Sequence, residues 1–190
     1  MTDNRIGKMH FRRMDEGSRA DFKVMQRVHE QHLANLPDLL LGMLNSLNAD
    51  DAYPVDRLTH SLQAATRAYR DGKDEEYVVC CLLHDVCESL APFNHGEVIA
   101  AILRPFISEA NHWMLAKHGI FQTYFYGEQL GIDKNQREQY RSSLHYERTV
   151  EFTARYDEVS FDRDYPSEPL ATFAPMVRRV LTKQWSPPGA

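Results

Sequence analysis

Apolar residues recur along the chain with the spacing of amphipathic helices, and the strict alternation typical of strands is nearly absent. The spacing predicts helices over residues 18–34, 38–47, 55–71, 75–90, 95–104, 108–129, 134–142 and 144–157, and a last helix that ends near Lys183. We expect Pro37 to separate the first two helices, Gly72 to end the third and Ser108 to cap the sixth. The pattern predicts an all-α fold with an irregular stretch over residues 160–169.

The composition limits the classes of protein that this chain can be. At 190 residues and 43% hydrophobic content, it is long enough for one domain with a substantial core. A net charge of -5 without a block of Lys and Arg argues against a nucleic-acid partner. No apolar stretch is long enough to cross a membrane, and the first residues lack a signal-peptide core. Cys80, Cys81 and Cys87 form no CxxC pair and are expected to be reduced thiols, so we expect a cytoplasmic protein with no membrane partner.

The doublet His84-Asp85 ends a strongly apolar helical run that begins at Tyr77. Adjacent residues on a helix lie roughly 100° apart, so both side chains can lean toward one point. Imidazole and carboxylate are ligands that borderline and hard transition metals prefer. A buried, unpaired His-Asp doublet is costly, and a bound metal removes that cost.

Other His and Asp residues occupy similar positions on neighbouring predicted helices. His60, His95, His118 and Asp157 each lie beside an apolar stripe that must face the core. Taken singly, each can be a helix cap, a solvated surface residue or a hydrogen-bonded core residue. Together with the doublet they fall on five predicted helices, and this coincidence favours a buried metal site.

The six residues resemble the ligand pattern of the HD superfamily, in which His, His-Asp and a distal Asp bind metal inside a helical bundle. His60, His84-Asp85 and Asp157 match that pattern, and His95 and His118 match the additional ligands of its mixed-valent di-iron oxygenases. That group includes myo-inositol oxygenase and bacterial oxygenases that cleave the carbon–phosphorus bond of hydroxylated phosphonates. The resemblance covers about residues 50–183. It implies a single HD-domain helical bundle over residues 49–190, with an N-terminal helical extension over residues 1–48, in one compact domain.

The resemblance also implies a role for each ligand. Asp85 would bridge two iron ions in the Fe(II)/Fe(III) state, with His60, His84 and Asp157 completing one iron and His95 and His118 holding the other. The second iron would then have open positions, as catalytic metal sites do. The implied reaction uses O2 to cleave a small hydroxylated substrate oxidatively, either a 1-hydroxyphosphonate or a related small polar metabolite. The oligomeric state stays open.

The chain departs from the phosphonate-cleaving branch at positions near the ligands. Asp50 and Tyr53 stand where that branch has Tyr and Glu, Glu88 stands where it has a His, and Gln122 where it has a Lys. These differences weigh against a phosphonate substrate. Tyr53, Glu88 and Gln122 remain candidate substrate contacts, Arg155 is a candidate contact for an anionic group, and Tyr53 is also a candidate for the open iron position before substrate binds.

Two other classes of function fit the same residues. A metal-dependent HD phosphohydrolase would use Mn, Ni, Mg or Zn to activate water against a phosphate ester or nucleotide, and a two-metal version would use all six ligands. A non-catalytic HD-fold binding module is the other alternative. We expect such a module to have lost ligands, and this chain keeps all six.

Overall fold

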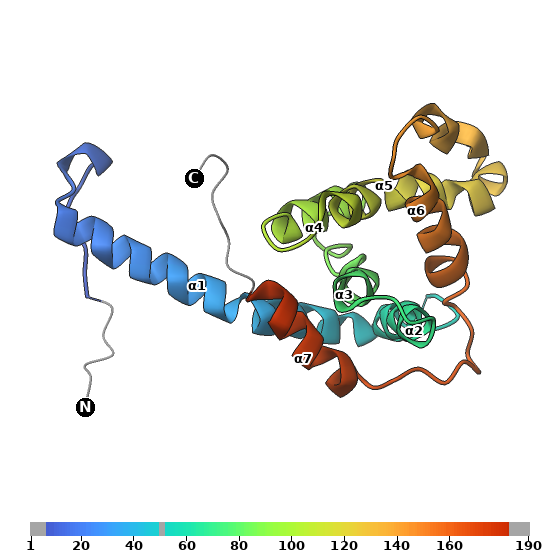
Figure 1. The fold of residues 1–190 in the computed structure, drawn as a ribbon, viewed down its shortest axis with the longest axis horizontal. Coiled ribbons are helices and arrows are strands. Elements are labelled where there is room, and N and C mark those ends of the chain that lie inside the picture. The colour runs from blue at the N-terminus through green and yellow to red at the C-terminus, as the bar shows by residue number, and fades with distance from the viewer. Residues whose placement is uncertain (1–6, 50–51, 183–190) are drawn as a thin grey trace. The chain divides into compact units, whose positions relative to one another are not determined.

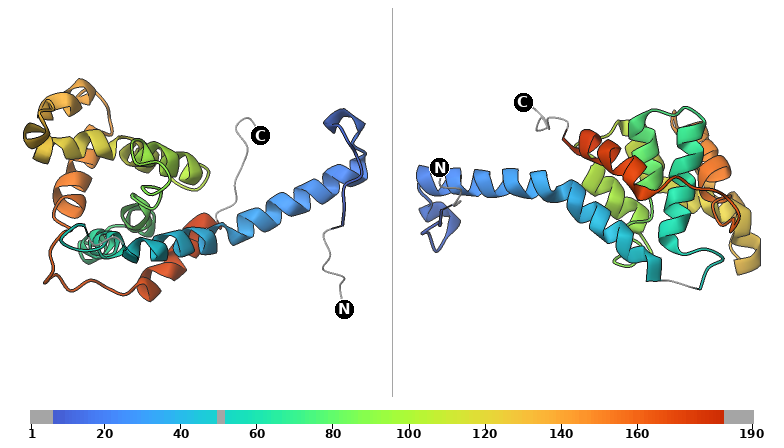
Figure 2. Two further views of the ribbon diagram at one scale, coloured as in Figure 1. Left: turned by 180° about the vertical axis from the view of Figure 1, so that it is seen from behind. Right: turned by 90° about the horizontal axis from the view of Figure 1, so that it is seen from below.

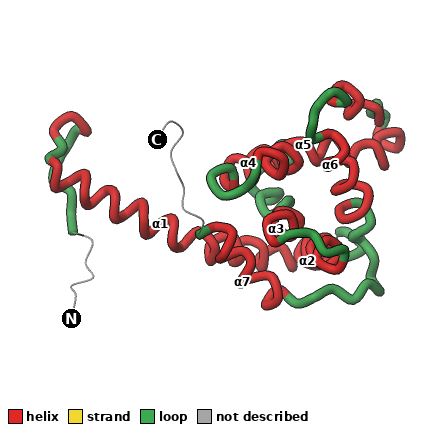
Figure 3. The backbone as a smooth tube through the Cα atoms, viewed as in Figure 1, coloured by secondary structure: helices red, strands yellow, loops and turns green. Residues whose placement is uncertain are grey.

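The structure is a computed structural model that describes residues 7–49 and 52–182. Within these residues the fold is entirely helical, with no strand, which confirms the predicted all-α class (Figure 3). None of the described helices is both long and apolar enough to cross a membrane. The helices are α1 (Arg19–Ser46), α2 (Arg57–Arg70), α3 (Glu75–Leu83), α4 (His95–Leu103), α5 (Glu109–Tyr126), α6 (Tyr146–Phe152) and α7 (Leu170–Leu181), and short 3-10 turns and one π segment, η5 (Thr153–Asp157), complete the fold.

The chain divides into two compact units between Leu39 and Leu40, inside α1. The boundary predicted from the sequence, at the end of the N-terminal extension, was residue 48. The expected helix break at Pro37 was wrong, because α1 continues through this residue. A proline removes one helical hydrogen bond, and the burial of Leu40 and Leu44 within the second unit favours a continuous helix despite that cost.

Side-chain caps and one glycine set several helix ends where the sequence predicted them. Ser108 caps α5 by accepting a hydrogen bond from the backbone N–H of residue 111, and Asp74 caps α3 in the same way. Gly72 has a φ of 74°, in the left-handed region, and ends α2. These local signals confirm the predicted boundaries at Gly72 and Ser108.

The helix predicted over residues 75–90 stops earlier, because α3 ends at Leu83 and a series of tight turns follows. The His84 imidazole lies 2.8 Å from the carbonyl oxygen of Cys81, which a continuing helix would pair with the backbone N–H of residue 85. Side-chain bonds of this kind compete with helical ones. The doublet is therefore held in a turn at the end of α3, where its side chains point into the bundle.

Helix α3 is the centre of the second unit, and residues 77–83 are all buried. It packs against α2, α5 and α7, while α5 also contacts α4 and α6 (Figures 1 and 2). A long connection over residues 158–169 runs from η5 to α7, as the irregular stretch predicted (Figure 1). Gln63 of α2 donates to the backbone carbonyl of Asp162 at 2.6 Å, and this bond fastens the connection to α2.

Candidate metal centre

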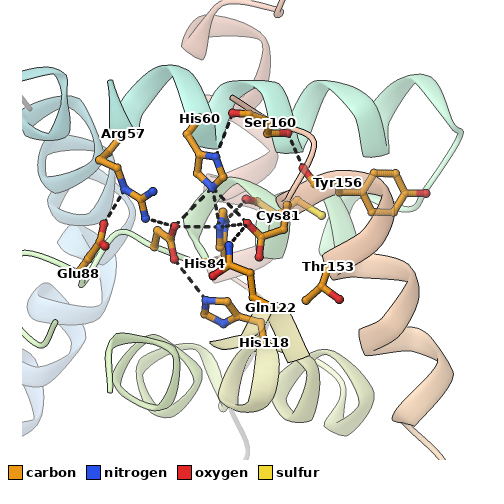
Figure 4. Close-up of polar contacts among 12 residues, drawn as sticks. Arg57, His60, Cys81, His84, Glu88, His118, Gln122, Thr153, Tyr156 and Ser160 are labelled. Atoms are coloured by element: carbon orange, nitrogen blue, oxygen red, sulfur yellow. Dashed lines mark hydrogen bonds and ion pairs between the residues drawn. The ribbon is translucent and has the colours of Figure 1, made fainter. Parts of the chain in front are cut away.

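The first cluster of side chains lies where α2, the turn after α3 and the π segment η5 meet. His60 comes from α2 and His84 follows α3 (Figure 4), Asp157 ends η5, and all three are fully buried. The Nε2 atoms of the two histidines lie 3.1 Å apart. Asp157 Oδ1 lies 3.3 Å from His60 Nε2 and 3.4 Å from His84 Nε2.

A second cluster adjoins the first through Asp85. Its Oδ2 atom lies 3.4 Å from His60 Nε2 and 3.1 Å from His84 Nε2. The other oxygen, Oδ1, lies 3.1 Å from His95 Nε2 and 3.3 Å from His118 Nε2. The two latter nitrogens are 3.2 Å apart. Asp85 thus divides its two oxygens between two histidine pairs, and the structure brings all six sequence-predicted ligands together.

Backbone carbonyl groups fix the orientation of three of the four imidazoles. Each of these rings places Nδ1 at hydrogen-bonding distance from a carbonyl oxygen, so in the neutral imidazole, the form that binds metal, Nδ1 carries the proton and the lone pair is on Nε2. The pairs are His60 with Ser160 at 3.0 Å, His84 with Cys81 at 2.8 Å, and His118 with Leu115 at 2.7 Å. Outer hydrogen bonds of this kind are what metal-binding histidines make.

With neutral imidazoles, the Nε2 lone pairs of the histidines would therefore face the lone pairs of the carboxylate oxygens. Gln122 donates to Asp157 Oδ1 at 3.0 Å, and Arg57 donates to Asp85 Oδ2, but the imidazole nitrogens receive no hydrogen from either. Among the described residues, Asp157 Oδ2 is buried without a hydrogen-bond partner. Buried acceptors without a positive charge between them are costly. Protons or metal ions at the two clusters would remove that cost, and this donor set fits a transition metal.

Without a metal, the pKa values of these groups also favour positive charge at the centre. Burial disfavours the charged form of His84, but the nearby Asp85 and Asp157 carboxylates outweigh it and raise its pKa to about 10. Burial likewise opposes ionisation of Asp157, and the positive charge of His84 outweighs it and lowers the pKa of that carboxyl. Without a metal, the centre holds at least one proton at neutral pH.

The π segment η5 positions Asp157, and the sequence did not predict it. The backbone N–H of Glu158 bonds to the carbonyl of Thr153, five residues earlier, instead of the usual four. Thr153 and Asp157 are both buried, along with Phe152 and Tyr156. Such π turns are frequent at functional sites, and this one ends at the buried Asp157.

Gly96 allows α4 and α5 to approach at His118, a role that sequence reasoning missed. A Cβ atom at residue 96 would lie 2.8 Å from Cε1 of His118 and 2.7 Å from the carbonyl oxygen of Leu115. These distances are shorter than real Cβ contacts allow. A side chain at residue 96 would therefore force His118 or the backbone of α5 to shift.

The candidate substrate contacts lie in different surroundings. Gln122 donates to Asp157, as described. Glu88 pairs with Arg57 at 2.6 Å (Figure 4). Arg57 is another residue near the centre that the sequence did not predict. Tyr53 is 41% exposed, and its ring stacks on Phe161, which stacks on His60.

Arg155 does not reach the cluster. Its side chain is 57% exposed and pairs with Asp71 at 2.7 Å on the surface. The expected anion contact at Arg155 is therefore not supported by its position. Asp50, which the sequence comparison with the phosphonate branch used, lies outside the described residues.

No protein-family model matches this chain, and no curated protein matches it either. The chemistry of the centre is therefore inferred from its own side chains and their geometry.

Because Asp85 faces both histidine pairs, its removal should affect both metal positions. We expect Asp85→Ala to lose both metal ions and His118→Ala to lose mainly one, as measured by metal content after reconstitution. His112→Ala, on the same helix α5 but outside the cluster, is the control and should keep both. Two metal ions bound per chain in Asp85→Ala would contradict the shared carboxylate.

The close approach at Gly96 gives a second prediction. Gly96→Ala should lower the free energy of unfolding by about 1–3 kcal/mol through overpacking, and should reduce metal binding at the second position. Gly119→Ala is the matched control, because a Cβ atom there meets nothing within 4 Å and alanine favours helices. Denaturant unfolding and metal content would check both variants. Equal stability and metal content in the two variants would be the contrary result.

A third prediction concerns protons. Since the pKa of His84 is raised to about 10 in the metal-free protein, His84 is protonated at pH 7. A metal needs the neutral imidazole, so binding of Fe(II) under nitrogen at pH 7 should release about one proton or more. Calorimetry in buffers of different ionisation enthalpy measures this number. Metal binding without proton release would show that the centre is unprotonated beforehand.

Proposed function

We propose that this chain is a di-iron oxygenase of the HD superfamily that uses O2 to cleave a small hydroxylated substrate oxidatively. The observation that carries the proposal is the division of the Asp85 oxygens between two histidine pairs. Two metal ions placed in these clusters would share one carboxylate. The sequence resemblance favours iron for the pair, and imidazole and carboxylate ligands suit it.

The two clusters differ in the number of ligands that they offer. The first has His60, His84, Asp157 and one oxygen of Asp85, whereas the second has His95, His118 and the other oxygen. The side chain of His95 is also the more accessible, at 19% exposed. A metal in the second cluster would keep open positions for substrate and O2, as catalytic sites require.

A bound iron pair would supply the redox chemistry of the oxidation. The protein's contribution is to hold the ligands and to keep water out. Gln122 fixes the carboxylate of Asp157 through its hydrogen bond to Oδ1. The ring of Phe161 stacks on His60 at 4.4 Å, and that of Phe152 meets His84 edge-on at 5.4 Å. Phe161 and Phe152 shield the first cluster, and Phe152 also meets His118 of the second cluster at 6.1 Å, so the more accessible His95 marks the open side of the centre.

The test is low-temperature electron paramagnetic resonance of the iron-reconstituted, partly reduced protein. We expect the signal of a coupled Fe(II)/Fe(III) pair, and we expect it to shift when the correct small hydroxylated compound is added. O2 consumption with that compound would then follow. Two irons that never stabilise the mixed-valent state, or a preference for Mn or Ni with release of phosphate from phosphate esters, would favour the phosphohydrolase alternative.

A further inference from the structure

We propose that Arg57 is a positioning residue for the metal pair: with Glu88 as its counter-charge, it fixes the orientation of the Asp85 carboxylate and tunes the charge at the metals. The effect on iron redox chemistry rests on the proposed function, whereas the effect on metal binding rests only on the geometry. Arg57 is not one of the six ligands.

The side chain of Arg57 links two segments of the chain. Arg57 is the first residue of α2, one turn before His60, and only 6% of it is exposed. Its Nη2 donates to Asp85 Oδ2, and its Nε forms an ion pair with Glu88 Oε2 at 2.6 Å that lacks the alignment of a hydrogen bond (Figure 4). Asp85 and Glu88 belong to the same run of turns after α3. One guanidinium therefore joins the start of α2 to the segment that carries the shared carboxylate.

The charge balance makes this contact specific to arginine. Charged arginines are almost never this buried unless they are paired. Burial disfavours the charged form, but the Asp85 and Glu88 carboxylates outweigh it, so the pKa of Arg57 is raised. The guanidinium carbon also lies 4.8 Å from the centre of the Tyr53 ring, which limits its movement. The planar guanidinium of arginine can donate to Asp85 while it pairs in charge with Glu88, whereas the compact charge of a lysine cannot reach both groups in this way.

The consequence for Asp85 follows from its two oxygens. Donation to Oδ2 fixes the plane of the carboxylate, and this leaves Oδ1 directed at His95 and His118 at 3.1 and 3.3 Å. Rotation of the carboxylate would break the bond to Arg57. The guanidinium thus maintains the division of the oxygens that a metal pair needs. Glu88, a candidate substrate contact, pairs with Arg57 through Oε2.

The same pair of charges acts on the metals electrostatically. A positive group hydrogen-bonded to a metal ligand withdraws electron density and favours the reduced metal, and outer groups commonly tune metal sites in this way. Glu88 offsets that positive charge. Removing the charge of Arg57 and removing the charge of Glu88 should therefore shift the reduction potential in opposite directions.

Three variants of the full chain separate orientation from charge: Arg57→Met, Arg57→Lys and Glu88→Gln. Affinity for Fe(II), and for Mn(II) as a second metal, reports orientation. We expect both Arg57 variants to bind about tenfold more weakly, because both lose the guanidinium that donates to Asp85 Oδ2. The midpoint potential of the iron pair reports charge: it should fall in Arg57→Met, rise in Glu88→Gln and stay near the parent value in Arg57→Lys. His112→Ala is the control.

The outcomes distinguish this inference from the proposed function. Parent-like affinity in both Arg57 variants, or potentials in Arg57→Met and Glu88→Gln that shift in the same direction or not at all, would overturn the role of Arg57. If Arg57→Met does not fold, Glu88→Gln still tests the effect of charge on the potential. The Glu88 side chain is 26% exposed, and glutamine has nearly the same shape as glutamate. If the parent binds two metals but forms no mixed-valent iron pair, the oxygenase proposal fails, and the Mn(II) affinities still test the orientation.

Discussion

A buried group of lone pairs that must be balanced by positive charge is the constraint on which the second unit depends. The carbonyl groups of residues 81, 115 and 160 hold three imidazoles with their Nε2 lone pairs directed inward. Two carboxylates complete the group at distances of 3.1–3.4 Å from those nitrogens and from that of His95. A core of this chemistry destabilises the fold unless protons or cations occupy it. Binding of a metal is therefore expected to stabilise the folded chain as well as to create its chemistry.

Several departures from regular helical structure are located at this centre. The end of α3 at Leu83 frees the doublet to point inward, and the π segment η5 ends at the buried Asp157. Gly96 brings α4 close to α5, and a Cβ atom there would collide with His118. Each departure sacrifices some local stability for the position of a ligand, and such sacrifices cluster at functional sites. Arg57 adds a direct electrostatic link between α2 and the turn of the doublet.

The sequence was sufficient to predict the helical class and to choose the six residues that meet at the centre. Both depend on period and residue type, which a single chain displays directly. The continuity of α1 through Pro37 was not predictable, because it depends on the burial of Leu40 and Leu44 in the folded chain. The contacts of Arg57 and Gly96 also depend on tertiary approach. An arginine at the start of a helix and a glycine beside a histidine look ordinary until α2 meets the turn after α3 and α4 meets α5.

The most direct test of the shared carboxylate is anomalous diffraction from crystals of the iron-loaded protein. Two iron peaks should appear about 3.5–4 Å apart. One should lie among His60, His84 and Asp157, the other beside His95 and His118, with Asp85 between them. A single peak, or iron bound only outside this centre, would contradict the account.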